Sequence, residues 1–182
     1  MNPVTEAEFS LPDGAKISLR RLVEADLPAL EWEGQFTHFR KLYQQHYANT
    51  KAGSTRIWVA VNDAGLVIGQ VFILLYAKNK EIADGKNRAY LFSFRIRQEW
   101  RGLGIGSFMM GFVENYLLSN GFQYLRLNVA RDNPRAIELY KKLGYTVMGP
   151  ESGIWRYEDH KGVWRTVHEP AWKMIKELKA EG

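Results

Sequence analysis

The 182-residue chain contains no cysteine. This absence excludes a disulfide framework, a Cys-ligated zinc or iron–sulfur site and a cysteine nucleophile. It also removes the attachment site for prenyl and palmitoyl groups. The four histidines do not have the spacing of a zinc motif, so the sequence predicts no metal site.

Long apolar runs are missing as well. The longest apolar stretch, from Gly65 to Ala77, is interrupted by Gln70 and is shorter than the roughly 20 residues that span a bilayer. The first residues lack a basic segment followed by an apolar one, so no signal peptide is predicted. We therefore expect a cytoplasmic protein that does not interact with a membrane.

The residues that are present have the composition of a globular protein, with 46% hydrophobic and 25% charged residues. No repeat, low-complexity tract or Pro/Gly/Ser-rich linker divides the chain, so one domain over residues 1–182 is expected. Lysine and arginine outnumber aspartate and glutamate by 25 to 20. This excess predicts either a phosphate-rich partner or a charge that only maintains solubility.

The apolar pattern predicts strands and helices in mixed order, which is typical of an α/β or α+β domain with a mixed sheet. Strands are expected at 16–22, 57–61, 66–76, 89–96, 124–130, 145–157 and 163–176. Helices are expected at 26–47 with a break at Gly34, from about 106 to Asn120, and at 134–143.

A glycine-rich turn, Arg101 to Ser107, stands between an apolar strand and an amphipathic helix. Glycine lets backbone amides approach a ligand closely, and the following helix start presents free N–H groups to an anion. The turn is not a P-loop, because Phe112 occupies the position of the required lysine. It is not a dinucleotide fingerprint either, because Met109 replaces the third glycine.

Two segments carry a family resemblance. Residues 96–106, IRQEWRGLGIG, resemble the acetyl-CoA motif V-x-P-x-x-[QR]-x-x-G-x-[GA] of the GNAT N-acetyltransferases. Residues 133–145 resemble that family's second signature, N-x-x-A-x-x-L-Y-x-x-x-G-[FY]. The likeness extends over about residues 15–178 and departs from the family at Gln98, where proline is common.

The resemblance implies a single GNAT-type domain of the α/β (α+β) class. Its sheet is expected to be mixed, mostly antiparallel and twisted, with about six to seven strands flanked by about four helices. A splayed, V-shaped acetyl-CoA cleft is expected between the strands at 89–96 and 124–130.

By the same resemblance, acetyl-CoA is the cosubstrate. The end of the strand before the turn offers backbone groups to the acetyl and pantetheine arm, and the turn wraps the pyrophosphate. Asn133 meets the pantetheine or helps to open the sheet. The implied cofactor-binding residues are Arg95, Ile96, Arg97, Arg101, Gly102, Leu103, Gly104, Ile105, Gly106, Ser107 and Asn133.

The implied chemistry is direct transfer of the acetyl group to an amine. The backbone N–H of Ile96 is the candidate donor to the oxyanion, and Tyr140 is the candidate catalytic acid for the leaving thiolate. Tyr140 alternatively packs between helix and sheet. No base is identified, because Asn128 replaces the glutamate of the branch that acetylates ribosomal protein N-termini. A water chain, Glu31, Glu33 or Glu99 can take that role.

The acceptor site in this family is usually walled by the first helices and the last strands. Here those segments are rich in aromatic residues, and the candidate substrate-binding residues are Glu31, Trp32, Glu33 and Phe36. Aromatic rings near carboxylates suit an amine-bearing cation. The same aromatic residues can equally belong to the core.

The sequence therefore predicts an acetyl-CoA-dependent N-acetyltransferase that acts on a primary amine of an unidentified small molecule, peptide or protein. The alternative is a non-catalytic acyl-CoA-binding sensor or regulatory module. No RNA- or DNA-binding motif is present, so no nucleic-acid partner is expected. Dimers are common in the family, and a homodimer is among the expected states.

Overall fold

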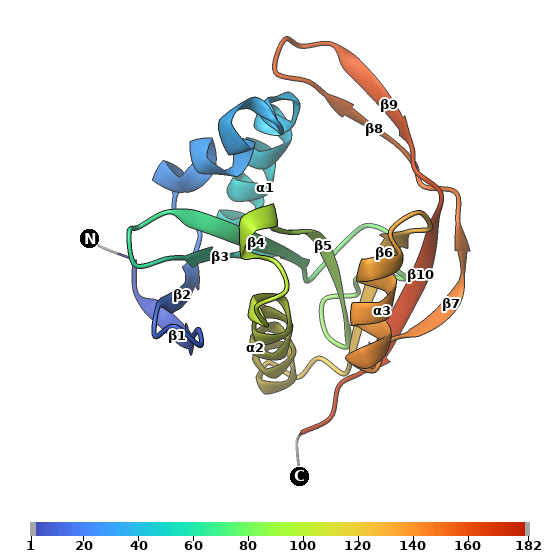
Figure 1. Ribbon diagram of the computed structural model, residues 1–182. Helices are drawn as coiled ribbons and strands as arrows, with labels where there is room; N and C mark the ends of the chain where they lie inside the picture. Colours follow the sequence, from blue (N-terminus) through green and yellow to red (C-terminus); the bar gives the residue numbers. More distant parts are fainter. Residues whose placement is uncertain (1–2, 181–182) are drawn as a thin grey trace.

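The computed structural model describes residues 3–180, so the first two and last two residues of the expected domain lie outside the described chain. Ten strands form two sheets (Figure 1), and the larger has the order β1-β2-β3-β4-β5-β6-β10-β7. The smaller sheet pairs β8 with β9. The strands are β1 (Thr5–Ser10), β2 (Lys16–Arg21), β3 (Thr55–Val61), β4 (Val67–Leu74), β5 (Arg88–Ile96), β6 (Tyr124–Ala130), β7 (Thr146–Glu151), β8 (Ile154–Glu158), β9 (Trp164–His168) and β10 (Ala171–Glu177).

The helices cover both faces of the large sheet. Alternate residues of a strand point to opposite faces, and β3 shows this: Trp58 packs in the larger core with α2, whereas Ile57 packs in a second core with α1. The helical segments are η1 (Glu24–Gly34), η2 (Thr37–Phe39), α1 (Arg40–Ala52), η3 (Gln98–Trp100), α2 (Ile105–Ser119) and α3 (Pro134–Lys142), where η marks a 3-10 helix. Within residues 3–180, no helix has the length and apolar character needed to cross a membrane.

The predicted class is confirmed, since the sheet is mixed: among the strands of residues 3–180, β5 and β6 pair in parallel and the other pairs are antiparallel. The strand count was wrong, because ten strands replace the expected six to seven. One addition is β1, a short and half-polar edge strand on β2 whose pattern is too weak to identify. The others arise because each expected C-terminal strand is divided, near Gly153 and at Pro170.

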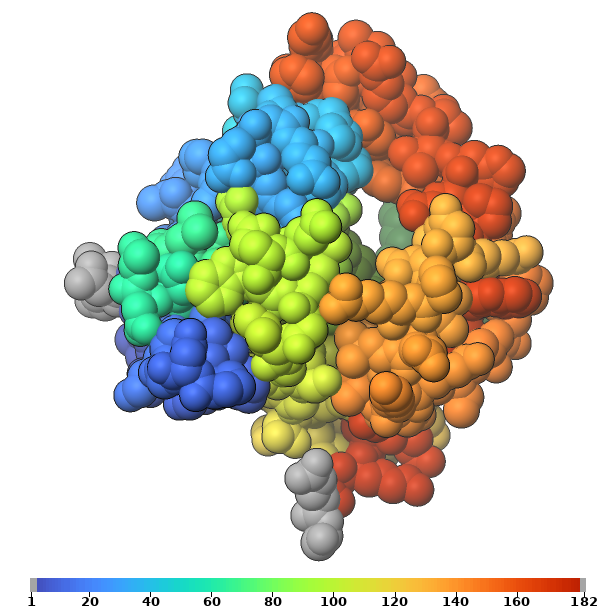
Figure 2. All heavy atoms as spheres, in the orientation of Figure 1, coloured from blue at the N-terminus to red at the C-terminus, as the bar shows by residue number. Residues whose placement is uncertain are grey.

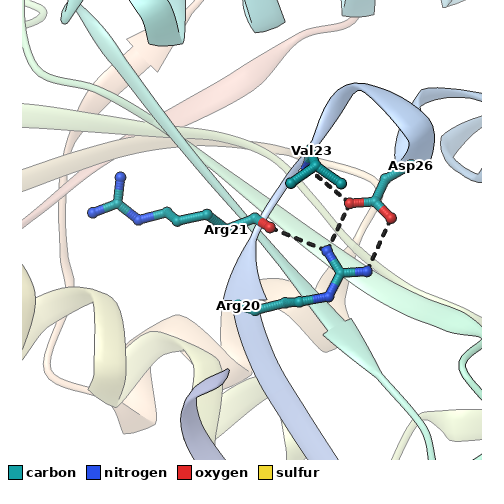
Figure 3. A network of polar contacts seen from close by, with 4 residues as sticks. All are labelled: Arg20, Arg21, Val23 and Asp26. Carbon is teal, nitrogen blue, oxygen red and sulfur yellow. Dashed lines mark hydrogen bonds and ion pairs between the residues drawn. The ribbon is translucent and has the colours of Figure 1, made fainter. Parts of the chain in front are cut away.

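The first helical region begins at a buried ion pair (Figure 3). The Asp26 carboxylate accepts two hydrogen bonds from the Arg20 guanidinium, at 2.7 and 2.9 Å, and one from the Val23 backbone N–H at 2.9 Å. Asp26 thereby ties the start of η1 to the end of β2. This contact fixes the segment that leads to one wall of the cleft described below.

The break expected at Gly34 is confirmed, but it is wider than predicted. Trp32 and Glu33 have positive φ values of 47° and 54°, and Gly34 follows at 106°. Pro28 lies inside η1, which is a 3-10 helix, and the α-helical part of the region begins only at Arg40. These positive φ values change the direction of the backbone, and the Trp32 side chain is buried.

The large sheet splits between β5 and β6. Their parallel pairing runs from Arg88 with Tyr124 to Leu91 with Leu127 and then stops. At this point β5 carries a bulge against β4, and Ser93 has a φ of 48°. The buried Gln70 amide donates to the Ser93 carbonyl at 3.2 Å and supports the bulge. The parts of β5 and β6 that follow Leu91 and Leu127 therefore diverge, as expected for the V-shaped cleft.

Candidate active site

The diverging strands enclose a cavity of about 880 Å³. Figure 2 shows it as an opening between the light-green and orange segments, below the orange-red hairpin. The cavity is lined by β5, the glycine-rich turn, β6 and α3, together with residues around η1 and next to β8 and β10. In Figure 1 the β8–β9 hairpin arches from the β7–β10 side of the sheet toward α1.

The glycine-rich turn forms one wall of the cavity. Gly102 and Gly104 have φ values of 76° and 87°, a conformation that side chains other than glycine rarely adopt. The first helical hydrogen bond of α2 runs from the Phe108 N–H to the Gly104 carbonyl, so the N–H groups of residues 105–107 have no partner within the helix. The Arg101 Nε donates to the Ile96 carbonyl at 2.7 Å and holds the turn against β5. This wall fits a pyrophosphate group.

The backbone of β5 directs one amide into the cleft. The Arg97 N–H bonds to the Ile68 carbonyl on β4, and the Arg95 carbonyl lies against Gly69 on the same strand. Backbone groups alternate in direction along a strand, so the groups of Ile96 point away from β4. Its carbonyl accepts from Arg101, and its N–H faces the gap between the diverging strands.

Tyr140 lies on the opposite wall, on α3. The Asn133 side chain caps this helix by accepting from the Ala136 N–H at 3.2 Å. Tyr140 is 7% exposed and lines the cavity. Its ring meets Tyr145 edge to face at 5.8 Å, and within residues 3–180 its hydroxyl has no hydrogen-bond partner. Burial, with the nearby Tyr90 as a second cause, raises the pKa of Tyr140, so the phenol keeps its proton at neutral pH.

Most of the cofactor residues that the sequence predicts line this one cavity. These are Arg95, Ile96, Arg101, Gly102, Gly104, Ile105, Gly106, Ser107 and Asn133. Two predicted residues do not reach it. Arg97 is buried with its Nε on the Val67 carbonyl and its two Nη atoms on Glu33, and the Leu103 side chain is 40% exposed.

The predicted substrate residues divide in the same way. Trp32 and Phe36 line the cavity, in edge-to-face contact at 5.1 Å. Glu31 and Glu33 do not line it, because Arg40 and Arg97 bind their carboxylates. These arginines lower the pKa of each glutamate, which makes both carboxylates weak bases. Glu99 is exposed and outside the cavity lining.

The structure adds cavity residues for which the sequence predicted no role. They are Gln35, Tyr90, Leu91, Phe92, Ser93, Phe94, Trp100, Val129, Ala130, Ala136, Glu138, Leu139, Gly153, Glu169 and Ala171. Among them Tyr90 is a second buried phenol in the cavity wall, and burial raises its pKa to about 12. Strand alternation could have indicated Tyr90, whereas no sequence signal marks the bulge at Ser93.

The surrounding aromatic residues serve partly as pocket and partly as core. Trp155 of β8 lines the cavity, while Phe39 packs between Trp155 and Tyr43. His46 is partly buried, with its ring against Phe72 and Phe92 of the second core. Within residues 3–180, no three His, Asp or Glu side chains gather into a group that could hold a metal ion.

Comparison with known proteins agrees with this geometry. A model described as "Acetyltransferase (GNAT) family" matches residues 19–145. An uncharacterized N-acetyltransferase of Bacillus subtilis, YdgE, is 24% identical over 150 residues, 81% of this chain and 91% of the relative. Thialysine N-epsilon-acetyltransferase of Bos taurus is 43% identical over 70 residues, 38% of this chain and 41% of the relative.

Solved structures with the same fold include the following two proteins. The spermidine/spermine N-acetyltransferase SpeG of Vibrio cholerae, in complex with manganese ions, has a TM-score of 0.66 and 18% identity over 89% of this chain and 92% of SpeG. Arabidopsis thaliana NAA60 in complex with acetyl-CoA has a TM-score of 0.66 and 18% identity, with coverages of 89% and 98%. At these identities the likeness concerns the fold.

Proposed function

Because the chain belongs to the GNAT acetyltransferase family and is an acetyl-CoA-dependent N-acetyltransferase, we propose that the cavity between β5 and β6 is its active site. The observation that carries this proposal is that the glycine-rich turn and Tyr140 line one cavity from different elements. One supplies an anion site and the other a protonated phenol.

The turn and its neighbours hold the cofactor. N–H groups of Ile105, Gly106 and Ser107 at the start of α2 face the pyrophosphate, and Arg101 and Arg135 add positive charge beside it. The Arg135 guanidinium lies 3.4 Å from the point where a Cβ on Gly102 would stand. Asn133, which also caps α3, borders the pantetheine arm. Acetyl-CoA supplies the acetyl group as an activated thioester.

The Ile96 N–H donates to the oxyanion that develops on the attacked carbonyl, because it faces the cleft and is fixed by the sheet. Tyr140 gives its proton to the departing thiolate sulfur. The acceptor amine must lose a proton before it attacks. Since arginines already bind Glu31 and Glu33, we assign this proton to solvent in the cleft rather than to either glutamate.

The test is a thiol-release assay with acetyl-CoA over peptides, polyamines, aminoglycosides and small amines. We expect release with at least one class. Tight CoA binding by isothermal titration, with no thiol release over the whole panel, would instead support the acyl-CoA sensor.

We further propose a cytoplasmic enzyme without a nucleic-acid or membrane partner. Its basic side chains at Arg101 and Arg135 line the cofactor cleft and serve a phosphorylated cosubstrate. We also propose a homodimer, and light scattering coupled to size-exclusion chromatography would distinguish a dimer from a monomer.

A further inference from the structure

Arg95 differs from its neighbours Arg40 and Arg97 because no described carboxylate pairs with it. Arg40 and Arg97 bind Glu31 and Glu33. Arg95 instead uses one Nη1 donor on the Tyr43 hydroxyl at 3.0 Å. Within residues 3–180 its remaining donors have no partner, although a guanidinium carries five N–H groups.

The guanidinium of Arg95 is held in a fixed place. It lies 4.5 Å from the ring centre of Phe36 and 5.6 Å from that of Phe39. Tyr43, to which it donates, is almost fully buried. A cation fixed by two rings and a buried phenol loses little side-chain entropy when a ligand binds.

Arg95 faces the acceptor end of the cavity rather than the cofactor end. The Ile96 side chain lies next to Gly106 at the start of α2. Because side chains alternate along a strand, Arg95 projects to the opposite face, toward η2 and α1. There it shares the cavity wall with Trp32, Phe36 and Trp155.

The charges at this end do not favour a polycation. Glu31 and Glu33 are already bound by arginines, and Arg95 contributes an unpaired positive charge. Glu169 is the acidic side chain that lines the cavity from the segment between β9 and β10. A ligand with one negative and one positive group matches this arrangement better than one with several ammonium groups.

We propose that the acceptor is a small primary amine that also carries a carboxylate, with an amino acid as the simplest case, and that Arg95 binds this carboxylate. The planar guanidinium offers parallel N–H donors that match the two carboxylate oxygens. The inference rests on the proposed active site and adds its substrate class.

The test compares matched acceptors. Thiol release from acetyl-CoA is measured with a panel of amino acids, the corresponding amino acid amides and the amines that lack the carboxyl group. We expect kcat/KM for the best amino acid to exceed that for its amide by about 10- to 100-fold, the range of a charge-assisted hydrogen-bonded pair. The difference should lie mainly in KM, because the contact is made before and during transfer.

Variants of Arg95 then test whether this side chain causes the preference for amino acids over their amides. Arg95→Gln should reduce the ratio of kcat/KM for the amino acid to kcat/KM for its amide to near one. Arg95→Lys should retain an intermediate ratio, because lysine keeps the positive charge but lacks the two parallel N–H donors. Arg156→Gln is the matched control, since Arg156 also lies over an aromatic ring, Trp164, but outside the cavity. It should keep the wild-type ratio.

The possible results distinguish a failure of the inference about Arg95 from a failure of the proposed function. Equal or faster acetylation of amides or simple amines by the wild-type enzyme would overturn the inference while the proposed function stands. An acid preference that survives Arg95→Gln would also overturn it. Thiol release with no member of any acceptor class would contradict the proposed function itself. Circular dichroism of each variant shows whether a lost ratio reflects lost folding.

Discussion

Tyr140 combines a buried ring with a hydroxyl that no described residue binds. Burial favours the neutral phenol, and the raised pKa of Tyr140 keeps the proton available until the thiolate forms. The group therefore stays protonated well above neutral pH. A fall of kcat between pH 7 and 9 must come from some other group.

We expect Tyr140→Phe to lower kcat by about 100-fold, the scale of a lost general acid, with little change in acetyl-CoA affinity. Thiol release measures the first quantity and isothermal titration with CoA the second. Tyr145→Phe is the control, because the Tyr145 hydroxyl is buried without a partner and lies outside the cavity lining. Unchanged turnover in Tyr140→Phe would remove Tyr140 from the mechanism.

His46 makes stability depend on pH. Burial lowers its pKa from 6.5 to about 4, so the folded protein holds the ring neutral where the unfolded chain protonates it. The unfolded state then binds more protons between these values, and stability is lost as pH falls from about 6.5 toward 4. A shift of this size corresponds to roughly 3 kcal/mol.

The measurement is the free energy of unfolding at pH 7.5, 6, 5 and 4 for the wild type and for His46→Leu. The wild type should lose stability more steeply than the variant over this interval. Parallel pH profiles would show that His46 titrates normally in the folded state.

At the scale of elements, the β8–β9 hairpin depends on a crossing of two chain segments. Gly153 has a φ of 68°, and a Cβ there would lie 1.8 Å from the Glu169 carbonyl oxygen. The Glu169 N–H also donates to the Gly153 carbonyl at 3.0 Å. Only glycine allows this approach, so the crossing determines where the hairpin and Trp155 lie over the cleft.

Gly153→Ala should therefore displace the hairpin. We expect a loss of about 1–3 kcal/mol in stability and a higher KM for the acceptor amine, with a smaller effect on the KM for acetyl-CoA. Gly149→Ala on β7 is the control, since nothing lies within 4 Å of its added Cβ. Equal effects of the two substitutions would show that the crossing does not position the hairpin.

Sequence patterns predicted the central elements well, because those elements bury a complete face. Short apolar runs identified β3 and β5, and the glycine-rich turn and Asn133 marked the starts of α2 and α3. The bulge at Ser93 and the reversal at Trp32 and Glu33 were not predictable. Tertiary contacts hold these residues at positive φ, a state that local propensity disfavours.

The candidate site was predicted on its cofactor side and only partly on its acceptor side. The turn's residues act through backbone groups, which the motif spacing fixes. The acceptor side depends on side-chain pairing, which spacing does not reveal. The sequence grouped Glu31 and Glu33 with the aromatics as cation-binding residues, whereas arginines bind both carboxylates and Arg95 is left unpaired.

On the scale of the whole molecule, the large sheet consists of two parts joined by a short ladder. The part from β1 to β5 meets the part formed by β6, β10 and β7 through the pairing of residues 88–91 with 124–127. Beyond Leu91 the cavity separates them. A ligand that lies in the cavity and contacts both walls should therefore stabilise the fold as a whole.

We expect CoA at 100 times its dissociation constant to stabilise the protein by about 2.7 kcal/mol and to raise Tm by roughly 5–10 °C for a chain of this size. Scanning calorimetry with CoA measures the shift. At the same free concentration ATP, which has the phosphates without the pantetheine arm, should give a smaller shift, because it reaches only the turn at α2 and so binds more weakly. Tyr140→Phe should retain the CoA shift, since the phenol acts on the departing thiolate rather than on binding. If ATP raised Tm as much as CoA at the same free concentration, the pantetheine arm would add nothing to binding, and the cofactor would not join the two parts of the sheet.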